Sequence, residues 1–166
     1  PVNGDINVGG IAGAMSIELE LDPEEDLKLE GSLMRKTVFQ RRATIVSSNN
    51  EGPIRSKKNN VGGIVGNMDL GYIKGCLSTG PVESTAGDYV GGIAGLAHGP
   101  IASSYAKCRL AGGNYIGGIA GYAKEIIGSY SLVKLDRAKA YIGAIAGDVD
   151  PLSNIKDNYF VSRSLH

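Results

Sequence analysis

One six-residue phrase recurs five times along the 166-residue chain, with glycine at its second, third and sixth positions in all copies but the last. The copies stand at 8–13, 61–66, 90–95, 116–121 and 142–147, and the last three intervals between their starts are 29, 26 and 26 residues. The first interval is 53 residues, close to two such periods. A fixed period in this range is typical of solenoids, in which each repeat contacts only its neighbours. The chain is therefore predicted to form stacked repeats rather than a domain folded around one active site.

A second pattern follows each of the last four phrases. It contains an isoleucine and then a small polar residue next to tyrosine or cysteine, as in 73–76, 101–105, 127–130 and 155–159. Glycine weakens strands, so units this short and glycine-rich must stack to be stable. We expect an all-β fold, a right-handed parallel β-helix or β-solenoid with coils of about 26 residues. A propeller is the alternative, although its blades usually need about 40 residues or more.

Stacked coils would place equivalent residues in columns about 4.8 Å apart. The phrase isoleucines would form an inward aliphatic column, and two sets of tyrosines would form ladders, the second capped by Cys76. The isoleucines are Ile11, Ile64, Ile93, Ile119 and Ile145, and the ladders are Tyr89, Tyr115 and Tyr141, and Tyr105, Tyr130 and Tyr159. Aromatic pairs add about 0.5–1.5 kcal/mol each, which favours a structural role for these tyrosines.

The regular repeat is interrupted over residues 14–43. Alternating apolar and charged residues flank an acidic, proline-containing turn at 22–26, which predicts a β-hairpin that replaces or decorates one degenerate coil. Regular repeats are expected over 44–160, within a single domain of 1–166. The acidic turn lacks the spacing and the glycine of a calcium loop, so a solvated turn is preferred to a metal site.

Charge and cysteine content narrow the function further. The chain has 17 basic and 17 acidic side chains, which disfavours nucleic-acid binding because that needs a basic surface. No apolar run approaches the roughly 18 residues that span a bilayer, so membrane insertion is not expected. Cys76 and Cys108 are predicted to remain unpaired, because aligning Cys76 with Tyr105 separates the two cysteines by about 10 Å of strand. The chain begins partway through a repeat, which suggests neighbouring domains at both ends.

Residues 73–95 combine Ile-x-x-Cys, Ser-Thr-Gly-Pro-Val and Tyr-Val-Gly-Gly-Ile-Ala-Gly. This combination resembles the GLUG motif, a short repeat of large bacterial surface proteins, and the resemblance covers about 44–160 with a fragment at 3–13. The chain departs from the motif in using Ile where the motif name has Leu, and in Ala144. GLUG repeats occur in adhesin-like proteins and beside the catalytic module of immunoglobulin A1-cleaving zinc metallopeptidases. The resemblance implies an extracellular, surface-displayed, non-catalytic module without a cofactor, acting as a stalk or as a binding surface for host proteins or glycans.

Motifs for chemistry are sparse in the sequence. The glycine phrase matches no phosphate loop, and the two histidines have no zinc-ligand spacing. The best candidate for a binding face is the corner after each phrase, where polar side chains recur at similar heights: Asp69, His98, Lys124, Glu125, Asp148 and Asp150. Polysaccharide-processing β-helix enzymes gather such groups on one face, which makes an enzyme of that kind the alternative function. Glycosidases need two carboxylates at a set separation, and no carboxylate pair recurs here.

Overall fold

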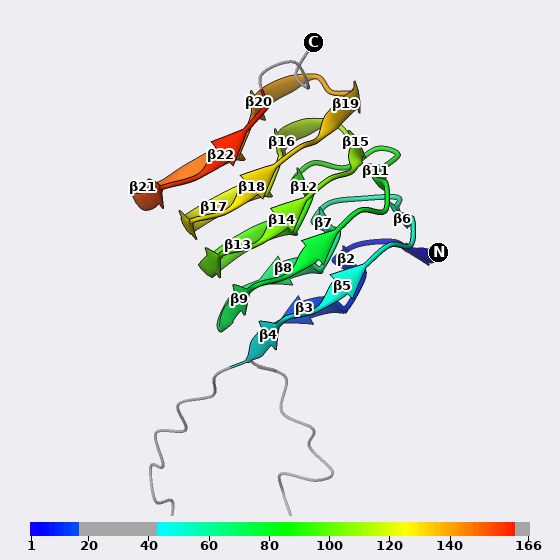
Figure 1. Cartoon of the computed structure of the whole chain (residues 1–166). Coiled ribbons are helices and arrows are strands. Elements are labelled where there is room, and N and C mark those ends of the chain that lie inside the picture. Colours follow the sequence, from blue (N-terminus) through cyan, green and yellow to red (C-terminus); the bar gives the residue numbers. More distant parts are fainter. Residues whose placement is uncertain (17–42, 162–166) are drawn as a thin grey trace, which may run out of the picture.

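The structure is a computed structural model that describes residues 1–16 and 43–161. These residues form strands β1–β22 and no helix, and all strand pairs are parallel. The strands build a β-solenoid of about four turns, with coils of about 28 residues (Figure 1). The predicted all-β parallel solenoid is confirmed.

The strands form four parallel sheets, which we call A to D. Along the chain, sheet A comes before the turn that leads into each glycine phrase, and sheet B comes after it. Sheet A consists of β1 (Val2–Gly4), β6 (Ile54–Ser56), β11 (Val82–Ser84), β15 (Arg109–Ala111) and β19 (Lys134–Arg137). Sheet B consists of β2 (Val8–Gly9), β7 (Val61–Gly62), β12 (Val90–Gly91), β16 (Asn114–Gly117) and β20 (Ala140–Gly143). Each pair of neighbouring strands belongs to successive coils, so like positions pair with like.

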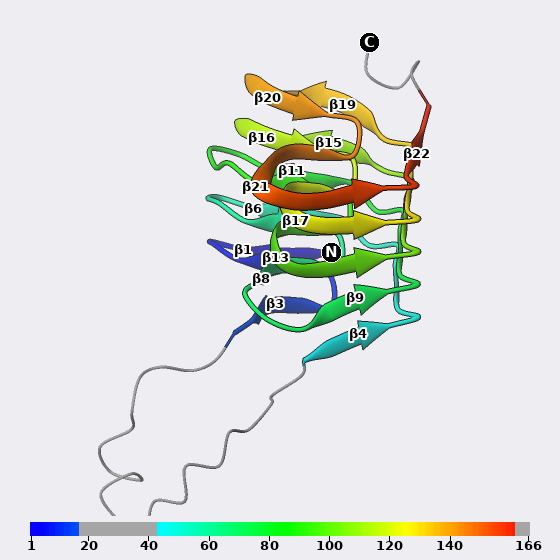
Figure 2. The same ribbon diagram turned by 90° about the vertical axis from the view of Figure 1, so that its left-hand side faces the viewer.

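The other two sheets follow the phrase. Sheet C consists of β3 (Ala12–Met15), β8 (Val65–Met68), β13 (Ala94–Ala102), β17 (Ala120–Ile127) and β21 (Ala146–Lys156), and β4 (Thr44–Val46) and β9 (Tyr72–Lys74) continue its far half (Figure 2). Sheet D consists of β5 (Asn49–Asn50), β10 (Leu77–Ser78), β14 (Tyr105–Ala106), β18 (Tyr130–Ser131) and β22 (Tyr159–Phe160).

The phrase glycines allow backbone segments to approach more closely than a Cβ atom permits. A Cβ at Gly117 would overlap the Ala120 carbonyl oxygen of the same coil, where the chain turns from sheet B into sheet C. A Cβ at Gly118 would overlap the Ala144 carbonyl oxygen of the next coil. The phrase therefore serves the turn within a coil and the contact between coils, and glycine is needed for its small size.

The contact between coils also explains the one departure from the phrase. A Cβ at Gly10, Gly63 or Gly92 would overlap the carbonyl oxygen of the equivalent residue in the next coil, as at Gly118. Ala144 is the last member of this column, and the described residues place no further coil over it. Its methyl group is tolerated because, among the described residues, no further coil places a carbonyl oxygen against it. Gly118, in contrast, lies against the carbonyl oxygen of Ala144.

The predicted isoleucine column is confirmed in its middle. Ile64, Ile93 and Ile119 are fully buried in one continuous core. At the ends, Ile11 is 48% exposed and Ile145 is only partly buried. The prediction was wrong for Ile11 because a terminal coil has a neighbour on one side only.

The first tyrosine ladder is confirmed and extends further than predicted. The rings of Tyr89 and Tyr115 stack at 4.8 Å between centroids, and those of Tyr115 and Tyr141 at 4.6 Å. Asn60 and Asn7 continue the column, and the Asn60 Nδ2 donates to the Asn7 Oδ1 at 2.8 Å. All five residues have left-handed backbones, with φ between 53° and 62°. Asparagine adopts this conformation readily, whereas tyrosine does so at a cost of about 1–2 kcal/mol that ring stacking helps to offset.

The second tyrosine column is confirmed in its register, and only its predicted cap is off by one residue. Tyr105 pairs with Leu77 and with Tyr130, and Tyr130 stacks on Tyr159 at 5.0 Å. Cys76 therefore does not cap the tyrosines. Its backbone N–H instead donates to the Oγ of buried Ser104, whose own N–H donates to Ser129. Both cysteines are buried and free, as predicted, although the alignment used to predict this was off by one residue.

The first interval of 53 residues contains one coil and not two. Met15 pairs with Met68, and Thr44 pairs with Tyr72, so both flanks of the interruption belong to the same coil. The additional segment enters at the corner between β3 and β4. The predicted boundaries of 14–43 need correction because Ala14 and Met15 are part of β3, and most of the predicted hairpin lies outside the described residues.

Gly118→Ala and Ala144→Gly form a matched pair that tests the contact between coils. Gly118→Ala is expected to destabilise the fold by about 3 kcal/mol, because overpacking a tight backbone contact forces the coils apart. Ala144→Gly should cost about 1 kcal/mol or less, the entropic cost of a glycine. Urea unfolding monitored by circular dichroism compares the two. Similar losses from both variants would contradict the steric role of the glycine column.

Candidate functional site

Four of the six predicted face residues come together in one column. Met68, Ala97, Ala123 and Val149 pair across successive coils, and the residues that follow them are Asp69, His98, Lys124 and Asp150. Asp69, His98 and Lys124 are exposed, and Asp150 is half-buried. We call these four residues the corner column.

The other two predicted residues lie in separate columns of sheet C. Asp148 pairs with Tyr122, two residues before the corner column. Glu125 pairs with Pro100 and with Asn154, beyond the register shift that marks the corner. The shift arises because the corner contains more residues in β21 than in β17. Beyond the corner, residues at equal distances from their glycine phrases no longer pair with one another. The six residues therefore do not form one set of equivalent positions.

Tyr122, which the sequence did not single out, connects the corner column to its neighbours. Its hydroxyl donates to Asp150 Oδ2 at 3.2 Å, and its ring meets the His98 ring edge-on at 5.4 Å. No motif marks Tyr122, since Asn67 and Leu96 occupy the paired positions of earlier coils. Only the register of the strands identifies it as part of this surface.

Titration of this cluster is governed by Asp150 and Tyr122. The backbone N–H of Leu152 lowers the pKa of Asp150, and the Tyr122 hydroxyl, Lys124 and His98 act in the same direction against partial desolvation. Desolvation raises the pKa of Tyr122, and the hydrogen bond to Asp150 raises it further. The pair therefore holds a carboxylate and a neutral phenol at neutral pH.

This arrangement does not suit Asp150 to act as a general acid. A general acid at neutral pH needs a carboxyl group whose pKa is raised, whereas the pKa of Asp150 is lowered. Within residues 1–16 and 43–161, no three His, Cys, Asp or Glu side chains are grouped closely enough to hold a metal ion. The corner column offers a fixed acceptor, a ring and a cation on an exposed edge.

A second surface, on the outer face of sheet A, was missed by the sequence prediction. A hollow of about 260 Å³ there is lined by Glu83, Arg109, Ala111, Asp136 and Arg137 together with Pro81, Val82 and Leu110. Glu83, Ala111 and Arg137 are paired positions on three successive strands. The hollow exists because the middle position carries only a methyl group.

Arg137 bridges this hollow from one coil to another two coils away. Its Nη2 donates to the Ser84 carbonyl oxygen at 2.6 Å and lies 3.9 Å from Glu83 Oε1. The side chain therefore passes over Ala111. No sequence motif could have revealed this contact, since 53 residues separate Arg137 from Ser84.

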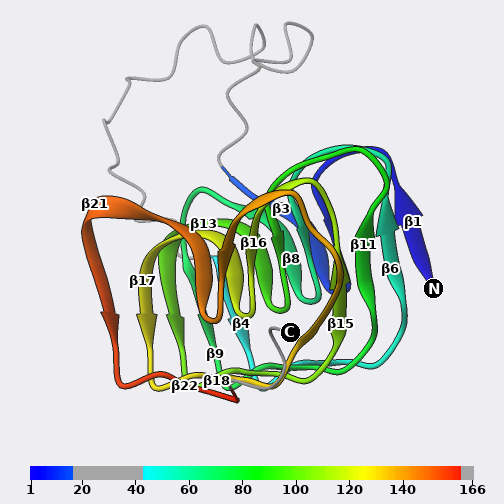
Figure 3. The same cartoon turned by 90° about the horizontal axis from the view of Figure 1, so that it is seen from above.

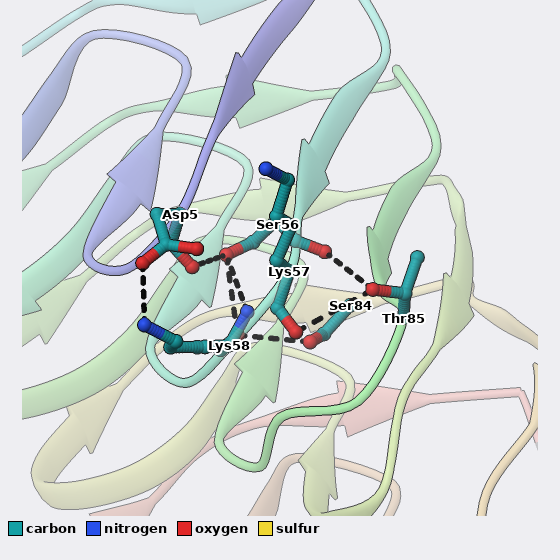
Figure 4. Close-up of polar contacts among 6 residues, drawn as sticks. All are labelled: Asp5, Ser56, Lys57, Lys58, Ser84 and Thr85. Atoms are coloured by element: carbon teal, nitrogen blue, oxygen red, sulfur yellow. Dashed lines mark hydrogen bonds and ion pairs between the residues drawn. The ribbon is translucent and has the colours of Figure 1, made fainter.

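Ser84 also belongs to a polar network that fixes the corner after sheet A (Figure 4). The Ser56 hydroxyl donates to the Asp5 carbonyl oxygen, and the Ser84 hydroxyl donates to that of Lys58, each at 2.8 Å. Lys58 Nζ pairs with Asp5 at 2.6 Å on the surface and, through this hydrogen bond, lowers the pKa of the Asp5 carboxyl group. These contacts link three successive coils, so the role of the network is structural.

Comparison of the chain with known protein families, with curated proteins and with solved structures finds no match. No helix of the described residues is long and apolar enough to cross a membrane. The resemblance to GLUG repeats therefore stays a prediction that rests on the residues of the chain.

Asp150→Asn is expected to lower the pKa of Tyr122 by removing a negative hydrogen-bond acceptor. The pKa should stay above that of a free tyrosine, since desolvation is the larger cause of the rise. Carbon-13 NMR of ring-labelled tyrosine, followed through alkaline pH, measures this change. Asp69→Asn is the control and should leave Tyr122 unaffected. An unchanged or raised pKa in Asp150→Asn would contradict the contact between Tyr122 and Asp150.

Proposed function

We propose that the chain is a non-catalytic structural and adhesion module of a bacterial cell-surface protein. It acts as a stiff stalk whose outer faces are available to ligands. The observation that supports this most directly is the continuous hydrogen bonding between coils. The backbone N–H groups of Ile64, Ile93 and Ile119 each donate to the equivalent isoleucine of the next coil, at 2.8–2.9 Å.

Such stacking suits a stalk for a physical reason. Each coil adds about 4.8 Å of height, and every coil is fixed to the next by four sheets and a continuous core. Bending the stack would break backbone hydrogen bonds on one side. The inward positions are occupied by the core, which leaves the outward side chains free to vary and to bind.

Surface display is proposed from the resemblance to GLUG repeats in adhesin-like proteins. The open ends of a solenoid expose strand edges that invite association, so we propose that neighbouring domains of the same protein cover them. Host proteins or glycans are the partners that this role implies. The module needs no cofactor for it.

The alternative is a polysaccharide-processing β-helix enzyme, or an accessory region of a secreted metallopeptidase. The lowered pKa of Asp150 disfavours this residue as the general acid that a glycosidase needs. The accessory role shares the non-catalytic assignment and differs only in the parent protein.

Protease shaving of intact source cells, with mass spectrometry of the released peptides, tests surface display. We expect peptides of this chain to be released before lysis, because the module would stand outside the cell. Release only after lysis would contradict the proposal. A cytoplasmic protein quantified in the same samples controls for cell breakage.

A turnover assay separates the enzyme alternative from the proposed role. The purified chain is incubated with a panel of neutral and acidic polysaccharides, and reducing and unsaturated ends are measured. The proposal predicts no new ends. Turnover that Asp150→Asn abolishes without unfolding the protein would overturn the non-catalytic assignment.

A further inference from the structure

The outer face of sheet A is a basic surface on a chain of zero net charge. Strands β6, β11, β15 and β19 lie next to one another there, as seen from above for the first three (Figure 3). The hollows on this face, and on the corner between sheets D and A that leads into it, are lined by five cationic side chains and two carboxylates: Arg55, Lys107, Arg109, Lys134 and Arg137, with Glu83 and Asp136. We call these seven residues the basic face.

The carboxylates do not neutralise the basic face. The pairs Arg55–Glu83, Arg137–Glu83 and Arg109–Asp136 are separated by 3.8–4.0 Å, and their side chains are 41–69% exposed. Pairs this loose and exposed hold their partners weakly. The arginines therefore keep N–H donors for a ligand, and the face keeps an excess of positive charge.

The hollows adjoin one another through shared lining residues across several coils, and together we call them the groove. The hollow of about 260 Å³ shares Pro81 and Arg109 with a neighbouring one of about 340 Å³, which extends to Lys107 and Lys134. A third, of about 240 Å³, shares the same two residues and reaches Pro53 and Arg55. Arg55 and Arg109 stand two strands apart, or about 10 Å, so the groove fits an extended chain rather than a compact small molecule.

We propose that this groove binds an acidic polysaccharide built from uronic acids. Arginine recognises carboxylates through paired, charge-assisted hydrogen bonds. Glu83 and Asp136 can accept hydrogen bonds from sugar hydroxyl groups, and the rings of Pro53 and Pro81 provide apolar surface for the faces of sugar rings. The groove thus offers partners for each chemical group of such a polymer.

The composition of the groove favours a glycan over a nucleic acid. Single-stranded nucleic acids are bound by aromatic side chains on which the bases stack, and no aromatic residue lines these three hollows. The inference rests on the proposed binding role of the module and specifies its ligand class. The proposed ligand-binding face is distinct from the corner column, which lies on sheet C.

Binding of polygalacturonate to the intact chain, measured by isothermal titration calorimetry, tests the inference. Arg55→Gln with Arg109→Gln is expected to weaken binding at least about tenfold, because each arginine supplies charge-assisted hydrogen bonds. These two arginines are chosen because neither makes the backbone contact that Arg137 makes with Ser84. Lys74→Gln with Lys156→Gln removes the same charge from exposed positions of sheet C and should change affinity less than about twofold, since surface charges this far away are screened.

Dextran and an oligothymidylate of matched charge complete the panel, and circular dichroism checks that each variant is folded. Neutral dextran should not bind, and the oligothymidylate should bind more weakly than polygalacturonate. Equal losses in the two double variants, or no binding of polygalacturonate, would overturn the groove assignment. Tighter binding of the oligothymidylate, lost in the arginine variant, would overturn the choice of a glycan. None of these outcomes bears on surface display, which the shaving experiment measures independently.

Discussion

The close approach of backbone to backbone at the glycine phrase is the constraint on which the stack depends. At Gly117 the chain passes within contact of the Ala120 carbonyl, and at Gly118 it meets the carbonyl of the next coil. These approaches allow the N–H of Ile119 to reach Ile145 at 2.8 Å, and they direct the isoleucine side chain into the core. A Cβ atom at either glycine would separate the strands that carry the hydrogen bonds. The cost of ordering so many glycines is offset by burial of the isoleucine column.

Residues with a left-handed backbone conformation form two columns, and each column lies at one of the other corners of the coils. Tyr115 and its equivalents form one, and the residue before each buried serine or cysteine forms the other, as at Gly75, Ser103 and Gly128. Glycine is the usual residue for this conformation, yet this chain often uses tyrosine, asparagine or serine. In the tyrosine and asparagine column, the side chains stack or hydrogen-bond along the axis. The same contacts therefore define the corners and join the coils.

The period of the repeat was enough to predict the fold, because a stack of equivalent coils imposes equivalent residues. The same reasoning placed Ile93 in the core and Tyr115 in a ladder. It failed where chemical similarity was a poor guide to register. Cys76 was aligned with Tyr105 because both follow small residues, whereas the left-handed residues Gly75 and Ser103 are the true equivalents. It also read the first interval as two periods, since spacing alone does not distinguish a coil from an inserted segment.

The functional surfaces were harder to predict than the fold. Corner residues such as His98 and Lys124 follow the phrase at a fixed distance, so their place in one column was predicted correctly from the sequence. Asp148 pairs with Tyr122 before the register shift in sheet C, and Glu125 pairs with Asn154 beyond it, so neither belongs to the corner column. The basic face could not be predicted from the sequence, because Arg55, Arg109 and Arg137 stand at different sequence distances from the glycine phrases that follow them. A shift between β15 and β19 moves Arg137 opposite Ala111, and only the three-dimensional register shows the hollow between them.

Native-state amide hydrogen exchange of Ile64, Ile93 and Ile119 tests the central role of the glycine contacts most directly. Each of these amides follows a phrase glycine and bonds to the next coil. If the stack depends on these approaches, the three amides should be among the most protected of the chain and should exchange only through opening of the stack. Exchange at the rate of an unstructured peptide would contradict the account, because the coils would then not be joined at the glycine phrase.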